Sequence, residues 1–471
     1  MTDVRRRVAA TAHLGALAAV DATVPRWPDA WIERAQRRRV RAIVQHAYAS
    51  VPFYRAAIDA AGLHPGDFRS AADLARLPLI DADVVQRDRE QFQSSAYGRN
   101  ARKGFHTSGS TTGVRRLVFW DDGALLRLAA HRHRDRRVLA SLAGESSVAT
   151  LLRELAGERR GWWQRAIARA VGCADDHRRL SIVPLDYASV THRALWSQST
   201  LIPARASHYR LLSPSETFAA AAAELDRVRP RVVFSYGSYA DEFLRYLDDT
   251  GLRVALPRLW VYMGDSVGAR ARELAGELGC RLYSAYASIE AGTIGFQCER
   301  GDGFHLNVDL CAVRIVDDAG RPLPDGETGD VVVSNLENRA TVLLNYRQGD
   351  RGVVTARPCP CGRRLPLLER LEGRRSEVVE TADGRRISAL NLEGLFRAEL
   401  RRTRQCQLHQ RAPGVLTWRI VPADDVDRDL MRTSIVERGR TVLGEDTALE
   451  VEFTDCIAKT ARGKLLRVTH A

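Results

Sequence analysis

Small and hydroxyl-bearing residues form one stretch of this sequence that could bind an anion. The stretch reads Thr107, Ser108, Gly109, Ser110, Thr111, Thr112 and Gly113. Because no bulky side chain blocks the approach, backbone N–H and hydroxyl groups of such a loop can surround a phosphate. It is not a Walker A motif, in which lysine follows the second glycine, because Val114 follows Gly113. A polar surface loop is the alternative, and the stretch alone does not decide between the two.

Lysine is almost absent from a chain that is rich in arginine. Of 71 Lys and Arg residues three are lysine, namely Lys103, Lys459 and Lys464. A bias toward GC-rich codons would replace lysine by arginine in this way. A lysine that remains is therefore a candidate for a task that suits a compact ammonium and not a planar guanidinium. Two of the three lie close together near the C-terminal end, where an ordinary exposed lysine is the alternative.

Three cysteines and one histidine have the residue types of a metal site. Cys298 and His305 lie close together in sequence, and Cys359 and Cys361 follow some tens of residues later as Cys-Pro-Cys. Three thiolates and one imidazole are a complete ligand set for a tetrahedral structural zinc ion, with no position left open for chemistry. The gap in Cys-Pro-Cys is shorter than the usual two residues, so three reduced thiols are the alternative. The other cysteines stand singly and do not indicate a disulfide framework.

Length and composition indicate two or three domains and no membrane span. The chain has 471 residues, of which 45% are hydrophobic and 27% charged, and no apolar run approaches the roughly 18 residues that cross a bilayer. The arginine-rich start followed by Ala and Leu resembles a signal peptide. However, the amphipathic pattern continues through Val40, Ile43 and Val44 without a clear cleavage site. We therefore expect a leading helical segment in a cytoplasmic protein.

A formal charge of +13 raises the question of nucleic-acid binding. The positive residues are scattered in pairs such as Arg136-Arg137. They form no stripe interleaved with aromatic residues, and no helix-turn-helix pattern accompanies them. Attraction for small anionic molecules is the more economical interpretation, so we expect no nucleic-acid partner. A nucleic-acid-binding protein, supported by charge alone, stays open as an alternative.

Strand and helix patterns alternate between residues 107 and 306, which predicts an α/β architecture. Short apolar runs at 231–235 and 259–263 predict strands. Amphipathic stretches at 240–249 and 268–278 predict helices. Mixed sheets in one large domain are expected from this pattern.

The pattern changes after residue 306. Hairpins predict a β-rich subdomain at about 307–372, which completes a large domain of residues 1–373. A boundary near Gly373-Arg374 precedes a small α+β domain of residues 374–471, with a hairpin, a helix near Asn391 and further strands.

Five motifs in a fixed order connect these sites to a known superfamily. They are the 107–113 loop, Ala285-Tyr286-Ala287-Ser288-Ile289-Glu290, Tyr346-Arg347-Gln348-Gly349-Asp350, Gly373-Arg374 and Lys459-Thr460-Ala461-Arg462-Gly463-Lys464. In this order the chain resembles the adenylate-forming enzymes, the acyl-CoA synthetase and luciferase superfamily. The phenylacetate–CoA ligase and capsule-biosynthesis ligase branch is the most similar part of it, because Val51-Pro52-Phe53-Tyr54-Arg55 and residues 62–78 resemble that branch's N-terminal region. The resemblance covers roughly residues 35–470.

The resemblance implies an ATP site. The 107–113 loop would hold the β- and γ-phosphates. Tyr286, flanked by Ala285, Ala287 and Ser288, would stack on adenine, and Glu290 would ligate Mg²⁺, for which carboxylates are usual ligands. Asp350 would accept both ribose hydroxyls, and Arg374 would lie near ribose and phosphate at a hinge.

The resemblance also implies the reaction. Lys464 would reach from the small, mobile domain to bridge the carboxylate of an acid and the α-phosphate. The acid, an aryl acid in our interpretation, would lie near Tyr236 and Gly237 and beside the Ala285–Ala287 stretch. We expect an ATP-dependent ligase that adenylates this acid and passes the acyl group to coenzyme A, or alternatively to an amine. The branch's pattern also resembles the Cys and His set, with structural zinc implied.

Three departures from the superfamily pattern leave a further alternative open. Arg115-Arg116 follows the loop where Pro or Lys is usual, Ile289 replaces a hydroxyl residue, and Ser376 stands where a hinge aspartate is common. A catalytically silent nucleotide-binding homologue, acting as a scaffold, therefore remains an alternative. The oligomeric state stays open, with a homodimer as one alternative.

Overall fold

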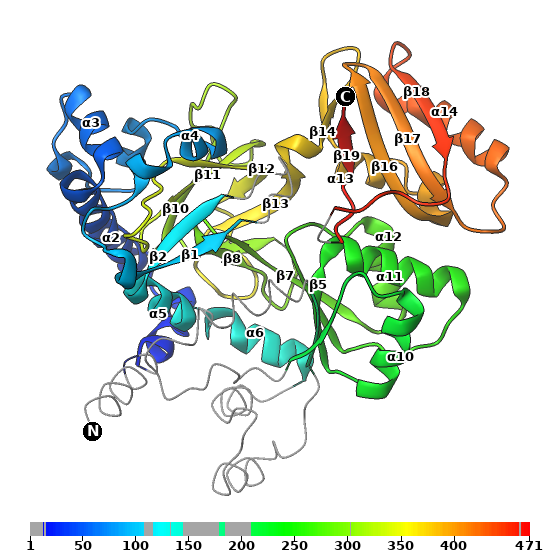
Figure 1. Cartoon of the computed structure of the whole chain (residues 1–471), viewed down its shortest axis with the longest axis horizontal. Coiled ribbons are helices and arrows are strands. Elements are labelled where there is room, and N and C mark those ends of the chain that lie inside the picture. The colour runs from blue at the N-terminus through cyan, green and yellow to red at the C-terminus, as the bar shows by residue number, and fades with distance from the viewer. Residues whose placement is uncertain are drawn as a thin grey trace, which may run out of the picture. The chain divides into compact units, whose positions relative to one another are not determined.

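The chain folds into two compact units, each assembled from segments that are far apart in the sequence. The computed structural model describes residues 13, 16–107, 116–131, 133–144, 179–183, 209–301, 303–460 and 463–471 (Figure 1). The first unit combines residues 1–176, 186–208 and 284–371. The second unit combines residues 177–185, 209–283 and 372–471. Among the described residues, no helix has both the length and the apolar character needed to cross a membrane.

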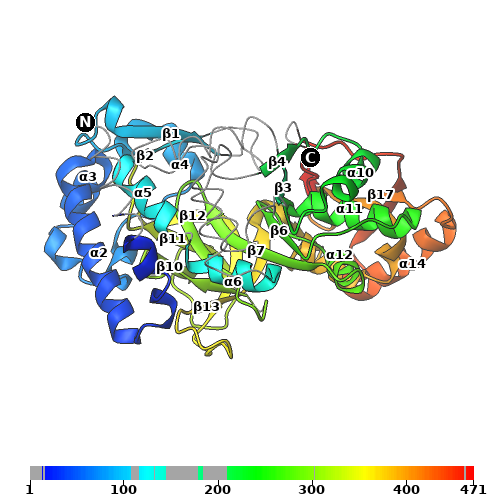
Figure 2. The same ribbon diagram turned by 90° about the horizontal axis from the view of Figure 1, so that it is seen from below.

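Two helices near the N-terminus of the first unit are separated by a proline. Helix α2 (Asp29–Ser50) buries one apolar face, which includes Val40, Ile43, Val44 and Ala47. It ends at Ser50, and the backbone of Val51 is extended (φ −120°, ψ 111°) because a following proline disfavours the helical conformation. Pro52 then occupies the first turn of α3 (Pro52–Ala60), where its missing N–H costs nothing. The two helices lie side by side (Figures 1 and 2).

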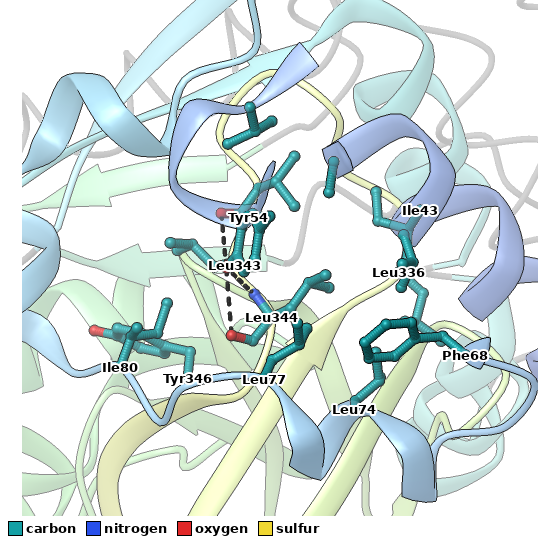
Figure 3. Close-up of a cluster of buried hydrophobic side chains, with 14 of the residues drawn as sticks. Ile43, Tyr54, Phe68, Leu74, Leu77, Ile80, Leu336, Leu343, Leu344 and Tyr346 are labelled. Carbon is teal, nitrogen blue, oxygen red and sulfur yellow. Dashed lines mark hydrogen bonds between the residues drawn. The ribbon is translucent and has the colours of Figure 1, made fainter. Parts of the chain in front are cut away.

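A hydrophobic cluster joins these helices to the segment before β12 (Figure 3). Tyr54, fully buried, accepts a hydrogen bond from Leu344 N at 2.7 Å, and its Oη lies 3.3 Å from the carbonyl oxygens of Val342 and Leu344. Burial raises the pKa of Tyr54, so its hydroxyl remains a donor at neutral pH. The cluster thereby fixes the chain ahead of Tyr346 and Asp350.

Within the described residues of the first unit, the remaining helices are short. They are α4 (Ala82–Arg87), α5 (Asp122–His131) and α6 (His133–Ala143), with 3₁₀ turns at Val24–Arg26, Pro65–Asp67, Ala72–Arg76, Arg89–Phe92 and Arg99–Ala101.

An antiparallel arrangement dominates the strands of the first unit. Their order is β10-β11-β12-β13-β9-β8-β7. The bounds are β7 (Arg281–Ser288), β8 (Gly292–Phe296), β9 (Phe304–Leu306), β10 (Cys311–Val316), β11 (Gly329–Asn335), β12 (Tyr346–Thr355) and β13 (Leu367–Arg374). A separate hairpin of β1 (Arg102–His106) and β2 (Leu117–Asp121) is also antiparallel. The hairpins predicted after residue 306 are therefore present as β10 and β11, which pair antiparallel.

Buried charges tie α5 and α6 to the rest of the first unit. The Arg134 guanidinium donates to Asp21 (Nε–Oδ1 3.0 Å) and to Asp309 (Nη1–Oδ1 2.7 Å). His131 Nδ1 lies 2.8 Å from Asp21 Oδ2, and its Nε2 lies 3.8 Å from Glu337 Oε2. Burial lowers the pKa of His131, but the Asp21 and Glu337 carboxylates outweigh burial and hold that pKa above its ordinary value. This cluster is structural, because every charge in it meets an opposite one.

Parallel strands form the first part of the second unit. Their order is β6-β5-β3-β4, and their bounds are β3 (Arg179–Ile182), β4 (Tyr209–Leu212), β5 (Val232–Tyr236) and β6 (Leu259–Met263). Helices α10 (Phe218–Val228), α11 (Gly237–Thr250) and α12 (Ala269–Glu277) belong to the same part, and α11 and α12 lie side by side in both views (Figures 1 and 2). The predicted α/β pattern is confirmed, with strands and helices within a few residues of the expected positions.

A four-stranded sheet forms the second part of this unit. Its order is β18-β17-β16-β19, with bounds β16 (Thr403–Ala412), β17 (Val415–Pro422), β18 (Ala448–Phe453) and β19 (Val468–His470). Helices α13 (Ala389–Leu395) and α14 (Arg428–Leu443), the hairpin β14 (Val378–Glu380) and β15 (Arg386–Ser388), and 3₁₀ turns at Arg375–Glu377 and Glu399–Arg402 complete it. The division into domains 1–373 and 374–471 stays a prediction.

Candidate functional site

The β1–β2 hairpin holds the two ends of the predicted phosphate loop together. Thr107 N donates to the carbonyl of Arg116 at 2.8 Å, and Arg116 N donates to Thr107 Oγ1 at 3.0 Å. Thr107 is buried. The other predicted loop residues lie outside the described residues: Ser108, Gly109, Ser110, Thr111, Thr112 and Gly113. The hairpin register thus supplies a fixed base for the loop.

Glu290, the predicted Mg²⁺ ligand, lies in the turn between β7 and β8, and its carboxylate is near the base of that loop. Its Oε1 is 3.7 Å from Arg116 Nη2 and 3.4 Å from Tyr346 Oη, which donates to it. The side chain of Asn335 donates to the Glu290 carbonyl at 3.0 Å. Burial and the nearby Glu290 charge raise the pKa of Tyr346, which keeps its hydroxyl a donor. A carboxylate held in this way can bind a hard divalent cation such as Mg²⁺.

The structure gives a packing reason for one departure from the superfamily pattern. The Ile289 side chain packs against a hydrophobic cluster of Phe105, Val118, Trp120, Ala124 and Leu125. Trp120 Nε1 also donates to the Ile289 carbonyl at 2.9 Å. An apolar side chain at this position therefore joins the β1–β2 hairpin to the turn that carries Glu290.

Tyr286 and Asp350, the predicted adenine and ribose residues, contact each other although they are far apart in sequence. Tyr286 Oη donates to Asp350 Oδ2 at 2.7 Å. The Tyr286 ring is buried and lies 6.1 Å from the Phe304 ring between centroids. Ala285, Ala287 and Ser288 flank Tyr286 on β7. Strands β7 and β12 thus bring together an aromatic ring and a carboxylate, as recognition of a nucleoside requires.

Lys464 is buried at the carboxyl end of β6 in the second unit. It is 5% exposed, its Nζ donates to the carbonyl of Gly264 at 3.2 Å, and it lies 3.7 Å from Asp265 Oδ2. Lysine is rarely buried to this extent without a partner. Asp265 has a second contact, because Gly237 N donates to its Oδ1.

Tyr236 and Gly237, the predicted acid-binding residues, lie at the same turn that Lys464 contacts. β5 and β6 are adjacent parallel strands, so their carboxyl ends meet at one edge, where open α/β sheets bind ligands. A β-carbon on Gly264 would meet the Tyr236 ring at 3.3 Å. The sequence motifs did not reveal Asp265, although a Gly-Asp-Ser turn directly after an apolar strand was an available signal.

Arg374, the predicted hinge residue, is the last residue of β13 and precedes the turn Arg375–Glu377. Its backbone is extended (φ −85°, ψ 150°). Its role stays a prediction, as does the meeting of Lys464 with the phosphate loop, whose central residues lie outside the described part of the chain.

The four predicted metal ligands come together in the first unit. The ligand atoms of Cys298, His305, Cys359 and Cys361 all lie within 4.8 Å of one another. Sulfur atoms about 2.3 Å from a tetrahedral zinc ion would be about 3.8 Å apart. Cys298 Sγ and Cys359 Sγ are 3.8 Å apart, and Cys361 Sγ is 3.3 Å from His305 Nε2. The residues therefore fit a closed four-ligand zinc site.

Two further contacts surround this cluster. His305 Nδ1 lies 3.4 Å from the Leu365 carbonyl, which turns Nε2 toward the thiols. The Arg363 guanidinium donates to both carboxylate oxygens of Glu299, at 2.7 and 2.9 Å. Burial lowers the pKa of His305 to about 4, so the imidazole is neutral, as a metal ligand must be.

Comparison with known proteins gives sequence relatives and similar folds. No family model matches the chain. It is 25% identical over 361 residues to phenylacetate-coenzyme A ligase of Thermus thermophilus, covering 75% of this chain and 72% of the relative. It is 23% identical over 364 residues to phenylacetate-coenzyme A ligase of Escherichia coli, covering 74% and 72%. A solved structure of 2-hydroxyisobutyryl-CoA ligase in the postadenylation state superposes with a TM-score of 0.68 at 19% identity, over 95% of this chain and 91% of that one.

Proposed function

We propose that this chain, an adenylate-forming ligase related to the phenylacetate–coenzyme A ligases, activates a carboxylic acid with ATP and transfers the acyl group to coenzyme A. The observation that carries the proposal is the buried ammonium of Lys464 at the carboxyl edge of β5 and β6. In an arginine-rich chain, a lysine at this place indicates a task for a compact positive charge.

The first half-reaction joins the acid to AMP. A carboxylate oxygen attacks the α-phosphorus of ATP, the bond from that phosphorus to the bridging oxygen breaks, and pyrophosphate leaves. Lys464 neutralises negative charge on the two reacting groups. Such neutralisation accelerates a reaction most where charge develops in a site shielded from water. Glu290 would hold Mg²⁺, which supplies further neutralisation of the phosphates when bound.

Nucleotide recognition in this proposal falls to the first unit. Tyr286 offers its ring to adenine, and Asp350 offers carboxylate oxygens to the ribose hydroxyls. The Tyr286 hydroxyl holds the Asp350 carboxylate in one orientation. The loop that follows Thr107 would hold the β- and γ-phosphates through its N–H and hydroxyl groups.

The second half-reaction transfers the acyl group. The sulfur of coenzyme A loses its proton and bonds to the acyl carbon, the bond from that carbon to the phosphate oxygen breaks, and AMP leaves. This step needs other groups than Lys464 in the site, so residues 375–471 would rotate about a hinge at Arg374. The acid is an aryl acid in this proposal, placed against Tyr236 and Gly237.

The experiment is pyrophosphate release measured over a panel of aryl and alkyl acids, followed by trapping with coenzyme A or with amines. Lys464→Ala should lower acid-dependent release by about 100-fold or more, the usual effect of removing one group that stabilises developing charge. Lys464→Arg should lower acid-dependent pyrophosphate release as well, whereas Lys103→Arg, the matched change on β1, should leave that release unchanged. No release with any acid would favour a silent nucleotide-binding homologue, and product with amines alone would favour an amide-forming ligase.

The thiol and imidazole cluster is proposed to hold a structural zinc ion. Its four ligands leave no position open for substrate, so the ion would join the turn after β8 to the segment between β12 and β13 and take no part in the reaction.

A further inference from the structure

Arg467 lies two residues beyond Leu465 and immediately before β19, and it is almost fully buried. The side chain is 11% exposed. Its Nη2 donates to the Ser266 carbonyl at 2.8 Å and lies 3.4 Å from Asp241 Oδ2, and its Nη1 contacts both carboxylate oxygens of Glu393. A guanidinium fork suits this arrangement, because it can satisfy several acceptors in fixed directions at once.

Lys464 and Arg467 both donate hydrogen bonds to the same short turn. Lys464 donates to the carbonyl of Gly264, and Arg467 donates to the carbonyl of Ser266 two residues later. The turn directly follows β6, at the edge where β5 ends at Tyr236 and α11 begins at Gly237. Because Lys464 is only three residues from Arg467, the contacts that hold Arg467 on this turn also limit where the backbone of Lys464 can lie.

Helix α11 receives the C-terminal segment at two consecutive residues. Arg467 approaches Asp241, and Lys459 Nζ lies 3.0 Å from Glu242 Oε2. These two contacts, made by residues 459 and 467, lie on either side of Lys464 in the sequence. A lysine side chain has several freely rotating bonds, so fixing the backbone on both sides of Lys464 reduces the freedom that its own contacts must restrict.

The partners of Arg467 are of two kinds. Glu393 lies on α13 within the C-terminal segment of residues 372–471, whereas Asp241 and Ser266 lie within residues 209–283. If the C-terminal segment moved away, Arg467 would keep Glu393 as its counter-ion. Asp241 would keep Arg245, whose Nε donates to its Oδ1 at 2.7 Å, and the N–H of Gly268, which donates to its Oδ2 at 2.5 Å. Separation would therefore leave neither Arg467 nor Asp241 as an uncompensated buried charge, which would otherwise be costly.

We propose that Arg467 is a positioning residue that holds Lys464 on the turn after β6 for acid activation, and that its contacts to Asp241 and Ser266 are released for acyl transfer. This inference rests on the proposed function, because it assigns Arg467 to one of the two half-reactions. A displacement of about 1 Å at a reacting group can cost about 100-fold in rate. The fork of Arg467 is thus expected to matter for activation and not for transfer.

The first test measures the two half-reactions separately. Arg467→Lys should lower acid-dependent ATP–pyrophosphate exchange about tenfold or more, since an ammonium cannot reach Ser266 and both carboxylates together. Conversion of chemically made acyl adenylate and coenzyme A to thioester should stay within about twofold. Arg419→Lys, the same change at an exposed pair with Glu452, is the control and should alter neither. Equal losses in both half-reactions, or no loss in either, would overturn the proposal.

A second variant reaches the same contacts without touching Arg467. A β-carbon on Gly268 would lie 2.8 Å from Asp241 Oδ2 and 3.0 Å from Glu393 Oε2, so Gly268→Ala must push these carboxylates from their places around the guanidinium. The Gly268 backbone is extended (φ −71°, ψ 168°), which alanine tolerates. This variant should show the same selective loss of exchange, and a selective loss of transfer would count against the proposal.

A third readout does not depend on activity. The chain contains three lysines, so mass spectrometry after acetylation of the full-length protein can follow each one. Arg467→Met should raise the modification rate of Lys464 several-fold relative to Lys103, with circular dichroism confirming that the variant is folded. An unchanged Lys464 rate overturns the proposal even if the wild-type protein releases pyrophosphate. If wild-type protein activates no acid but Lys464 becomes reactive, the proposed function fails while the positioning role of Arg467 stands.

Discussion

Replacing Gly237 by alanine tests whether the turn after β6 must stay in place for the reaction. A β-carbon on residue 237 would lie 2.7 Å from the Asp265 carbonyl oxygen and 2.8 Å from that of Ser266, whereas ordinary contact begins at 3.4 Å. The backbone of the turn must therefore retreat by up to 0.7 Å, the difference between 3.4 and 2.7 Å. Backbone atoms cannot rotate away as a side chain can, and overpacking of this kind costs about 1–3 kcal/mol of stability.

The same retreat carries the acceptor of Lys464 with it. Gly264 is adjacent to Asp265, so Gly237→Ala should displace the ammonium by a similar fraction of an ångström and lower acid-dependent pyrophosphate exchange about 10- to 100-fold at saturating acid. A variant that merely obstructed acid binding would raise KM and leave kcat unchanged.

Gly276→Ala is the matched control, because the helix α12 position is exposed and a β-carbon there meets nothing within 4 Å. It should retain full exchange and gain up to about 1 kcal/mol of stability from helix propensity. The assay is isotope exchange with thermal unfolding on both variants. Equal exchange by Gly237→Ala and Gly276→Ala would refute the reasoning that the turn positions Lys464.

The remaining predictions concern the first unit. Arg134→Met should destabilise the protein by about 3–5 kcal/mol, because it removes the buried guanidinium that pairs with both Asp21 and Asp309. In denaturant unfolding, the control Arg321→Met, at an exposed pair with Asp317, should change stability by less than about 1 kcal/mol. Similar losses in both variants would contradict the assignment. The raised pKa of His131 means that its charge stabilises the fold fully below the unfolded pKa of about 6.5, and that this contribution is lost as pH rises through the folded value. The difference in unfolding free energy between wild type and His131→Gln should therefore shrink as pH rises above about 6.5, and a difference independent of pH would exclude this linkage. Elemental analysis should find one zinc per wild-type chain and little zinc in Cys359→Ser. The control Cys456→Ser, which changes an exposed thiol, should keep the ion. No metal in gently purified wild type would rule out the four-ligand site.

Local sequence patterns were sufficient for elements whose apolar periodicity is strong. The runs at 231–235 and 259–263 are strands β5 and β6 within a residue or so. Helix α14 and strand β16 were not predicted individually. The polar and apolar residues of α14 follow no regular period, and some of the buried positions of β16 are glutamines instead of apolar residues. Such segments take their conformation from the partners that cover them, as when β16 pairs with both β17 and β19.

The candidate site divides in a similar way. Lys464 could be singled out because arginine is so abundant elsewhere, and the Cys and His set because thiols and imidazoles are the ligands that zinc prefers. Arg116 and Arg467 could not, since one arginine among many has no local signature, and for Asp265 the Gly-Asp-Ser turn after an apolar strand was the available signal. Their contacts with Glu290, Gly237 and Ser266 join residues that are distant in the chain.

Residue types and spacings were enough to identify the chemistry that this chain offers: a hydroxyl-rich loop, a scarce ammonium and a complete metal ligand set, with the nucleotide motifs identified by their resemblance to a superfamily. Residue type fixes charge, softness and hydrogen-bonding capacity without any knowledge of the fold. Which of these groups meet depends on the folded chain, because strand order and register follow from burying apolar faces over the whole chain. That is why the ammonium of Lys464 was identifiable beforehand, while the arginine that holds its backbone on the turn after β6 was found only in the folded molecule.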